Sequence, residues 1–161
     1  MKLIFLDFDG VVNTPMWDDN GEHCRFYHPN DKKVNDFQAI CWLNELCKKT
    51  DAKIVLSTSW KDYKDLDFLR EILYNSGLKK NIEIIGKTPR IRTKYCHIDR
   101  TVEIETYLEE HKEDDIQNYV ILDDDEIYGL LRDNFVKCNT CYGFKEPEFE
   151  KALQVLTKTA T

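Results

Sequence analysis

The chain has 161 residues, a formal net charge of −7 and an apolar fraction of 42%. This length suffices for one domain with a substantial core, and the negative charge disfavours a nonspecific nucleic-acid binder without excluding a local basic patch. No apolar run is long enough to span a membrane, and the first residues do not resemble a signal peptide, so we expect a cytoplasmic protein.

The first third of the chain alternates between apolar and polar segments. The apolar run at 2–6 predicts a strand that is buried on both faces of a sheet. Turn formers and polar aromatic residues dominate 13–30, which predicts a long loop or a small flap. Apolar residues then recur at helical spacing over 31–49, which predicts a helix with an N-terminal cap at Asp31.

The remainder of the chain continues the alternation of strands and helices. The predicted strands are at 53–57, 82–85, 119–122 and about 135–137, and the predicted helices are at 61–75, 100–111 and 146–158, with a short helix after 125. This order predicts an α/β fold: a Rossmann-like, three-layer parallel sheet with helices on both faces. No Gly/Ser-rich or Pro-rich linker divides the chain, so we expect a single domain over 1–161.

Acidic residues follow two of the predicted strands at their carboxyl ends. Asp7 and Asp9 follow the first strand, and Asp123 and Asp124 follow the fourth. Ligands of open parallel sheets bind at this edge, and side chains two residues apart on an extended segment face the same way. Carboxylates gathered there repel one another unless a cation joins them. Oxygen ligands without His or Cys favour Mg²⁺ over zinc.

Several further residues of the sequence are suited to binding a phosphoryl group. Gly10 permits close approach by a substrate. The hydroxyl residues at 57–59 end the second strand and can bind phosphoryl oxygens, although a helix cap is the simpler interpretation of one of them. Arg100 begins a helix, where a guanidinium and the helix N-terminus can both face an anion. The alternative for Arg100 is a surface ion pair with Glu103, one turn along that helix.

Together these motifs resemble the haloacid dehalogenase (HAD) superfamily. The sequence has "DFDG" after the first strand, a Thr or Ser after the second, a basic residue ahead of the last acid-bearing strand, and "LDDD" after it. The segments "LDFDGVVN", "VLSTSW", "R..EI..YL" and "YVILDDD" are further similar to the HAD domain of multi-enzyme RNA-repair proteins. The resemblance implies a Mg²⁺-dependent phosphatase of the capless type, since about twenty residues between Gly10 and Asp31 are too few for a cap domain.

The resemblance also implies a role for each matched residue. Asp7 is the expected nucleophile, which forms an aspartyl-phosphate, and Asp9 is the acid that protonates the leaving oxygen and then activates water. Thr58 is expected to bind the phosphoryl group, with Ser57 and Ser59 as rivals.

The implied metal site combines both acidic motifs. Its expected members are Asp7, Asp9 through its backbone carbonyl, Asp123, and Asp124 through the waters of the ion. Arg100, with Gly10 nearby, is expected to bind the phosphoryl group and neutralise its developing charge. The basic residues that compete for this role are Lys87, Arg90, Arg92 and Lys94. Asp125 is expected to cap a helix.

An open site without a cap domain suits a bulky substrate. The expected partner is a phosphorylated small molecule, a nucleotide or a nucleic-acid end, and the RNA-repair resemblance favours the last two. Trp17, Phe26 and Tyr27 of the flap either stack on a nucleotide or pin the loop to the core. The alternatives to an enzyme are a phospho-acceptor domain of the receiver type and a catalytically inactive phosphate- or metal-binding module.

The cysteines add a separate hypothesis. Cys138 and Cys141 form a single CxxC, which without a second pair only weakly indicates zinc, so reduced thiols are the simpler interpretation. Cys41 and Cys47 fall on helical positions that predict core thiols.

Overall fold

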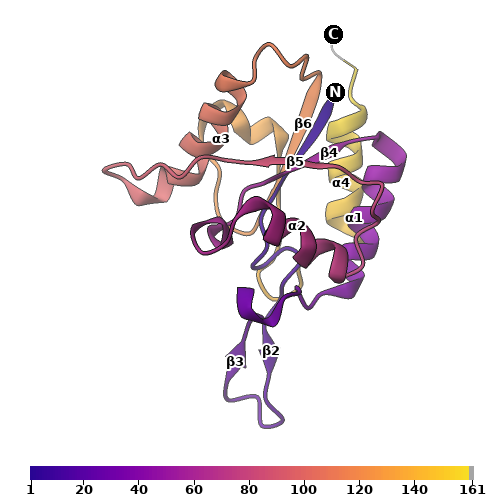
Figure 1. Cartoon of the computed structure of the whole chain (residues 1–161), viewed down its shortest axis with the longest axis vertical. Coiled ribbons are helices and arrows are strands. Elements are labelled where there is room, and N and C mark those ends of the chain that lie inside the picture. The colour runs from indigo at the N-terminus through magenta and orange to yellow at the C-terminus, as the bar shows by residue number, and fades with distance from the viewer. Residues whose placement is uncertain (160–161) are drawn as a thin grey trace.

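The computed structural model describes residues 1–159 and has a parallel sheet at its centre (Figure 1). The five strands of this sheet lie in the order β5-β4-β1-β6-β7, and each adjacent pair is parallel. Their bounds are β1 Lys2–Leu6, β4 Lys53–Leu56, β5 Ile84–Lys87, β6 Asn118–Asp123 and β7 Phe135–Lys137. The strand order reverses beside β1, which places a ligand site at the carboxyl ends of β1 and its neighbours.

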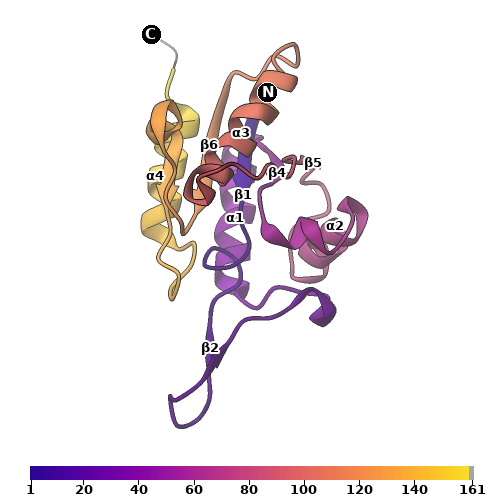
Figure 2. The ribbon, with the colours of Figure 1, turned by 90° about the vertical axis from the view of Figure 1, so that its left-hand side faces the viewer.

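Helices cover both faces of the sheet (Figure 2). Their bounds are α1 Phe37–Thr50, α2 Leu66–Asn75, α3 Asp99–Glu110 and α4 Glu146–Thr157. Ile4 and Leu6 of β1 pack into the core with α1, α2 and α4, whereas Leu3 and Phe5 pack on the other face with α3. Because both faces are buried, the strands read as continuous apolar runs. The structure confirms the predicted α/β class.

The start of α1 differs from the sequence prediction. Residues Pro29–Asp31 form a separate 3₁₀ turn, and α1 begins at Phe37. Asp36 caps α1 by accepting a hydrogen bond from the Ala39 N–H over 3.0 Å. The predicted cap at Asp31 is therefore wrong, because its carboxylate instead accepts a hydrogen bond from the His28 N–H.

Other local predictions also need correction. The predicted helix at 61–75 consists of a 3₁₀ turn, Ser59–Asp62, followed by α2, which Asp65 caps. Strand β5 lies two residues later than predicted. No helix begins at Asp125 within the described chain; its carboxylate accepts a hydrogen bond from the next N–H, and the short 3₁₀ helix is at Gly129–Asn134.

The cysteine predictions are partly wrong. Cys47 is a buried core thiol as expected, but Cys41 on the same helix is exposed. Cys138 is buried and Cys141 is exposed. Neither belongs to the single group of potential metal ligands found within residues 1–159.

A hairpin of β2 (Met16–Trp17) and β3 (Cys24–Arg25) occupies the predicted flap and projects beyond the carboxyl edge of the sheet (Figures 1 and 2). Trp17 is 58% exposed and does not pin this hairpin to the core, while Phe26 and Tyr27 are half-buried. Within residues 1–159, no helix combines the length and apolar character that crossing a lipid bilayer requires.

Candidate active site

Asp7, Asp123 and Asp124 converge at the carboxyl edge of the sheet because β1 and β6 are neighbouring parallel strands. Leu6 pairs with Leu122 in the register, so the acids that follow these two residues lie side by side. One carboxylate oxygen from each of the three acids lies within 4.8 Å of the others. Asp7 and Asp123 are buried and Asp124 is half-buried. We call these three residues the acidic trio.

The acidic trio is electrostatically unfavourable by itself. Burial, reinforced by the charge of Asp123, raises the pKa of Asp7 well above its ordinary value. Burial also raises the pKa of Asp123 from 3.8 to about 6. Oδ2 of Asp123 is buried and has no hydrogen-bond partner among the described residues. An oxygen without a hydrogen bond is costly to bury, and an all-carboxylate donor set fits Mg²⁺.

Gly10 allows the two acidic loops to meet. Its φ is +78°, and a Cβ atom at this position would lie 2.2 Å from Oδ2 of Asp124. The hydroxyl of Thr140 donates a hydrogen bond to the same Asp124 oxygen over 2.7 Å. A side chain at position 10 would therefore displace Asp124 from the acidic trio.

Asp9 lies outside the acidic trio, and two donors hold its carboxylate. The side-chain amide of Asn13 donates to Oδ1 over 2.7 Å, and the indole N–H of Trp60 donates to Oδ2 over 3.2 Å. Trp60 packs edge-on against the buried ring of Phe8, with ring centroids 5.2 Å apart. Asn13 also donates to the carbonyl of Tyr27 and so connects Asp9 to the base of the hairpin.

Arg100 supplies the positive charge closest to the acidic trio. Its Nη1 lies 3.4 Å from Oδ1 of Asp7 and 3.4 Å from Oδ2 of Asp123. Burial by itself would lower the pKa of Arg100, but the surrounding acids, with Asp7 and Asp123 foremost, together raise it, so the guanidinium stays charged. The alternative of a surface pair with Glu103 is wrong, because both Glu103 carboxylate oxygens bind other groups.

The hydroxyls at 57–59 have three different environments. The Ser57 hydroxyl accepts a hydrogen bond from Nη1 of Arg100 over 3.4 Å and so lies beside the acidic trio. The fully buried Thr58 hydroxyl accepts a hydrogen bond from the N–H of Trp60 over 3.3 Å and caps the following 3₁₀ turn. This matches the expectation that one of the three hydroxyls caps the next helix. Ser59 is exposed.

The family of the chain follows from comparison with known proteins. Residues 3–149 match the family model described as the HAD domain in Swiss Army Knife RNA repair proteins. The chain belongs to this family. Neither a curated protein nor a solved structure matches it. At the level of the superfamily, membership supports a HAD-type phosphatase, and the acidic trio of this HAD domain is a group that could hold a metal ion.

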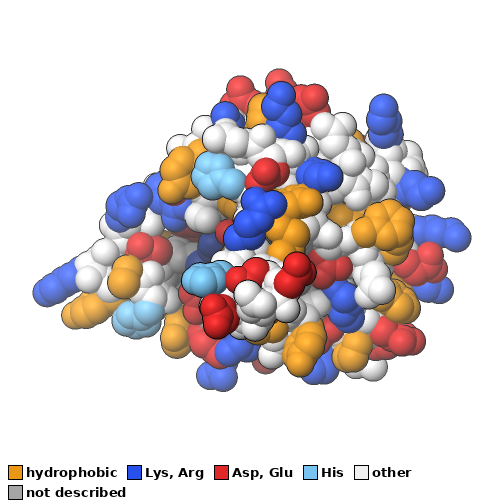
Figure 3. All heavy atoms as spheres, turned by 90° about the horizontal axis from the view of Figure 1, so that it is seen from below, with side chains coloured by type: hydrophobic (Ala, Val, Ile, Leu, Met, Phe, Trp, Pro, Cys, Tyr) orange, Lys and Arg blue, Asp and Glu red, His pale blue; other side chains and the backbone are white. Residues whose placement is uncertain are grey.

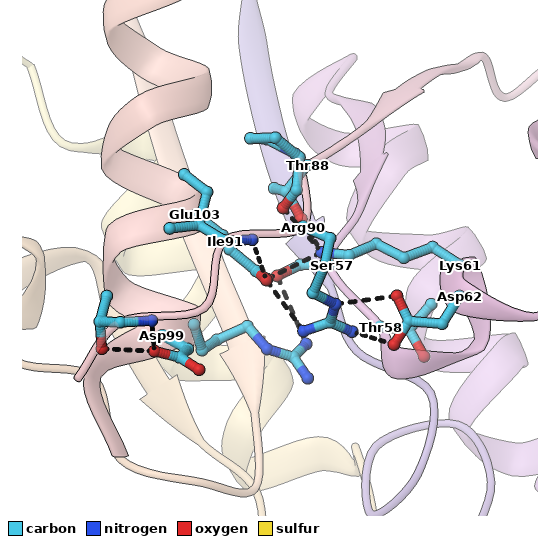
Figure 4. A network of polar contacts seen from close by, with 12 residues as sticks. Ser57, Thr58, Lys61, Asp62, Thr88, Arg90, Ile91, Asp99 and Glu103 are labelled. Atoms are coloured by element: carbon cyan, nitrogen blue, oxygen red, sulfur yellow. Dashed lines mark hydrogen bonds and ion pairs between the residues drawn. The ribbon is translucent and has the colours of Figure 1, made fainter. Parts of the chain in front are cut away.

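Figure 4 shows a buried ion-pair network in the HAD domain, which we call the Lys61–Glu103 cluster. Its Glu103 lies on α3 three residues after Arg100. Nζ of Lys61 donates to Oε2 of Glu103 over 2.8 Å and to the hydroxyl of Thr88 over 2.6 Å. Arg90 donates to Oε1 of Glu103 over 2.9 Å and to both carboxylate oxygens of Asp62. The side chains of Lys61 and Glu103 are only 2% and 0% exposed.

The Lys61–Glu103 cluster positions the helix that carries Arg100. Glu103 is one turn along α3, and its partners come from the 3₁₀ turn after β4 and the loop after β5. The cluster therefore ties the start of α3 to the strand ends that form the site. Sequence reasoning missed Lys61, because a lysine in the polar stretch "SWKDYKD" has the pattern of a surface residue. Arg90 was a phosphate-binding candidate, but its guanidinium belongs to this cluster.

Proposed function

We propose that this HAD domain is a Mg²⁺-dependent phosphomonoesterase that acts through an aspartyl-phosphate. The observation that carries the proposal is the convergence of the acidic trio and Arg100 around Asp7. Asp7 and Asp123 would hold Mg²⁺ directly, together with the backbone carbonyl of Asp9, and Asp124 would order its waters. When bound, the ion would offset the acidic charge and polarise a phosphoryl oxygen.

The protein residues account for both chemical steps. The Asp7 carboxylate attacks phosphorus, so an Asp7–phosphorus bond forms while the ester bond breaks, and Asp9 gives its proton to the leaving oxygen. Asp9 then takes a proton from the water that attacks phosphorus, which releases phosphate and restores Asp7. Trp60 and Asn13 keep the Asp9 carboxylate aimed during this exchange.

Positively charged and hydrogen-bonding groups would hold the phosphoryl oxygens in both steps. Arg100 lies against Asp7 and would stabilise the charge that develops on these oxygens. Thr58 and Ser59 at the end of β4, with Gly10 opposite, would complete the phosphate site, and Ser57 is favoured as an additional contact because it touches Arg100.

We infer that the substrate is a nucleotide or polynucleotide phosphate end rather than an enclosed small metabolite. The family description supports this substrate class. The segment between Gly10 and Asp31 forms only the β2–β3 hairpin, which is too small to act as a cap domain. We further propose that 1–161 is one HAD-like domain in which this hairpin serves as a flap.

A panel of phosphate esters tests the proposed function. It should include an aryl phosphate, mononucleotides, and oligonucleotides with a 3′- or 5′-phosphate, each with Mg²⁺ and with EDTA. We expect turnover with Mg²⁺ that disappears in EDTA and in Asp7→Asn. Inertness toward every ester would refute the phosphatase. Stable phosphorylation by acetyl phosphate without turnover would instead favour a module of the receiver type.

A further inference from the structure

We propose that Arg92, Lys94, Tyr95, His97 and Tyr128 form a binding surface for the single-stranded polynucleotide that carries the phosphate to be removed. We call these five residues the aromatic–basic platform. This inference rests on the proposed function and adds to it the surface that recognises the chain next to the terminal phosphate.

The aromatic residues of the platform form a continuous set of solvent-accessible rings. The ring centroids of Tyr95 and His97 are 6.1 Å apart, and those of His97 and Tyr128 are 5.7 Å apart. Tyr95 is 57% exposed and Tyr128 is 40% exposed. Every nucleobase offers a π-face that can stack on such rings, so recognition of this kind does not depend on base identity.

Local hydrogen bonds hold the platform in place before any ligand binds. The N–H and hydroxyl of Thr93 donate to Oδ1 of Asp99 over 2.8 and 2.5 Å. The N–H of Tyr95 donates to the Thr93 hydroxyl over 3.1 Å, and the N–H of Ile98 donates to the Tyr95 carbonyl. A loop held in this way loses less conformational freedom when a ligand binds.

The charge of the platform favours a polyanion. Nζ of Lys94 lies 5.9 Å from the Tyr95 ring centroid, and neither Lys94 nor Arg92 has an ion-pair partner among the described residues. In Figure 3 the loop between β5 and α3 projects to the left and carries Lys, Arg, His and hydrophobic side chains. These cations can bind backbone phosphates while the rings stack on bases.

The platform adjoins the candidate active site. Arg100 follows His97 by three residues, so their Cα atoms are at most about 11 Å apart. The N–H of Tyr128 donates to the hydroxyl of Thr101 over 3.1 Å, which ties the loop after β6 to the start of α3. A strand lying on the platform would therefore lead directly toward Arg100 and Asp7.

The hairpin offers a much less favourable surface for the same ligand. Its tip carries exposed Asp18, Asp19 and Glu22, which repel phosphates. Although Trp17 is exposed on this hairpin, the neighbouring acids oppose a polyanion there. The charge distribution therefore assigns the polynucleotide to the platform rather than to the hairpin.

Binding measured without turnover provides the first test. Fluorescence anisotropy of a labelled single-stranded RNA 10-mer with a terminal phosphate is recorded in EDTA, where hydrolysis cannot occur. We expect Tyr95→Ala/Tyr128→Ala to weaken binding at least tenfold. Arg92→Gln/Lys94→Gln should reduce the slope of log K against log salt by about one to two. Tyr142→Ala, an exposed tyrosine outside the platform, is the matched control and should bind as the wild type.

Steady-state kinetics provides the second test and separates this inference from the proposed function. The ratio of kcat/KM for the oligonucleotide to that for an aryl phosphate should fall at least tenfold in Tyr95→Ala/Tyr128→Ala. Unchanged binding and an unchanged ratio would overturn the platform while leaving the phosphatase intact. If Tyr95→Ala/Tyr128→Ala loses RNA binding and the wild type hydrolyses no ester, the platform is supported and the proposed function is refuted. Equally tight binding of a blunt duplex would overturn the platform.

Discussion

The indole N–H of Trp60 donates a hydrogen bond to Oδ2 of Asp9 over 3.2 Å, from a ring that itself packs on Phe8. Trp60 thus links the core of the domain to the residue proposed to move the proton. Because Asn13 occupies the other oxygen of Asp9, the carboxylate has a defined orientation before substrate arrives.

Replacing Trp60 with Phe tests whether Trp60 positions the carboxylate of Asp9. Trp60→Phe keeps a ring against Phe8 but removes the donor, so we expect kcat for an alkyl phosphate to fall about tenfold, as for loss of one hydrogen bond. An aryl phosphate, which needs little protonation of its leaving group, should be affected less. Asp9→Asn should lower alkyl phosphate turnover by about 10²–10⁴. An equal loss on both esters in Trp60→Phe would contradict the positioning role.

Replacing Gly10 with Ala should weaken metal binding. The new Cβ would meet Asp124 at 2.2 Å, and φ of +78° is itself unfavourable for Ala by about 1 kcal/mol. We expect calorimetry to show Mg²⁺ affinity reduced at least tenfold. Gly129→Ala is the matched control, because Gly129 has φ of +67° and a Cβ added there would meet nothing within 4 Å. Equal Mg²⁺ affinity in the two variants would show that the contact with Asp124 is unimportant.

Stability without metal should decrease as pH rises. Burial raises the pKa of Asp123 from 3.8 to about 6, so between these values the folded protein binds more protons than the unfolded chain. The stabilising contribution is therefore full below about pH 4 and lost above about pH 6. In EDTA at pH 7, Asp123→Asn should unfold at higher urea, with a gain of about 3 kcal/mol.

Magnesium should make the wild type more stable than Asp123→Asn, which is the reverse of the order expected in EDTA. With Mg²⁺ at pH 7 the wild type should gain stability, whereas Asp123→Asn should gain much less, since ligand binding to the folded state stabilises it. Urea titrations at pH 5, 6 and 7, with Mg²⁺ and with EDTA, measure both effects. A wild type that is most stable at pH 7 in EDTA would show that burial does not raise the pKa of Asp123 in the folded protein.

Breaking the Lys61–Glu103 cluster should destabilise the fold substantially. Lys61→Met removes a buried cation from Glu103, and we expect a loss of about 3 kcal/mol in urea unfolding. Lys53→Met is the control, since Lys53 pairs with an exposed Glu83 and should contribute less than about 1 kcal/mol. A similar loss in both variants would mean that burial does not distinguish the two ion pairs.

The sequence predicts the sheet well because burial leaves a strong local pattern. Residues 3–6 are apolar throughout, and acids directly after such a run are expected at the carboxyl edge of the sheet. Helix starts are harder to predict, because Asp31 and Asp36 both precede apolar residues and only the packed structure selects Asp36 as the cap. Arg100 was one of five basic candidates, favoured because it begins a helix, and the structure places its Nη1 3.4 Å from Oδ1 of Asp7. Its phosphoryl-binding role stays a prediction.

Long-range polar contacts explain what sequence reasoning missed. Lys61 and Glu103 are far apart in the chain, and neither sits in an apolar pattern that would predict burial. Trp60 looks like an ordinary core residue, and its N–H bond to Asp9 depends on how β4 lies beside β1. Such pairs follow from the topology of the sheet rather than from residue spacing.

The register that joins Leu6 to Leu122 also has a kinetic consequence. Asp7 and Asp123 become neighbours only when β6 docks on β1, a contact between segments remote in the sequence and therefore slow to form. Until then the chain lacks the group of carboxylates that could hold a metal ion, and these acids do not repel each other. Mg²⁺ should therefore act late, retarding unfolding more than it accelerates folding.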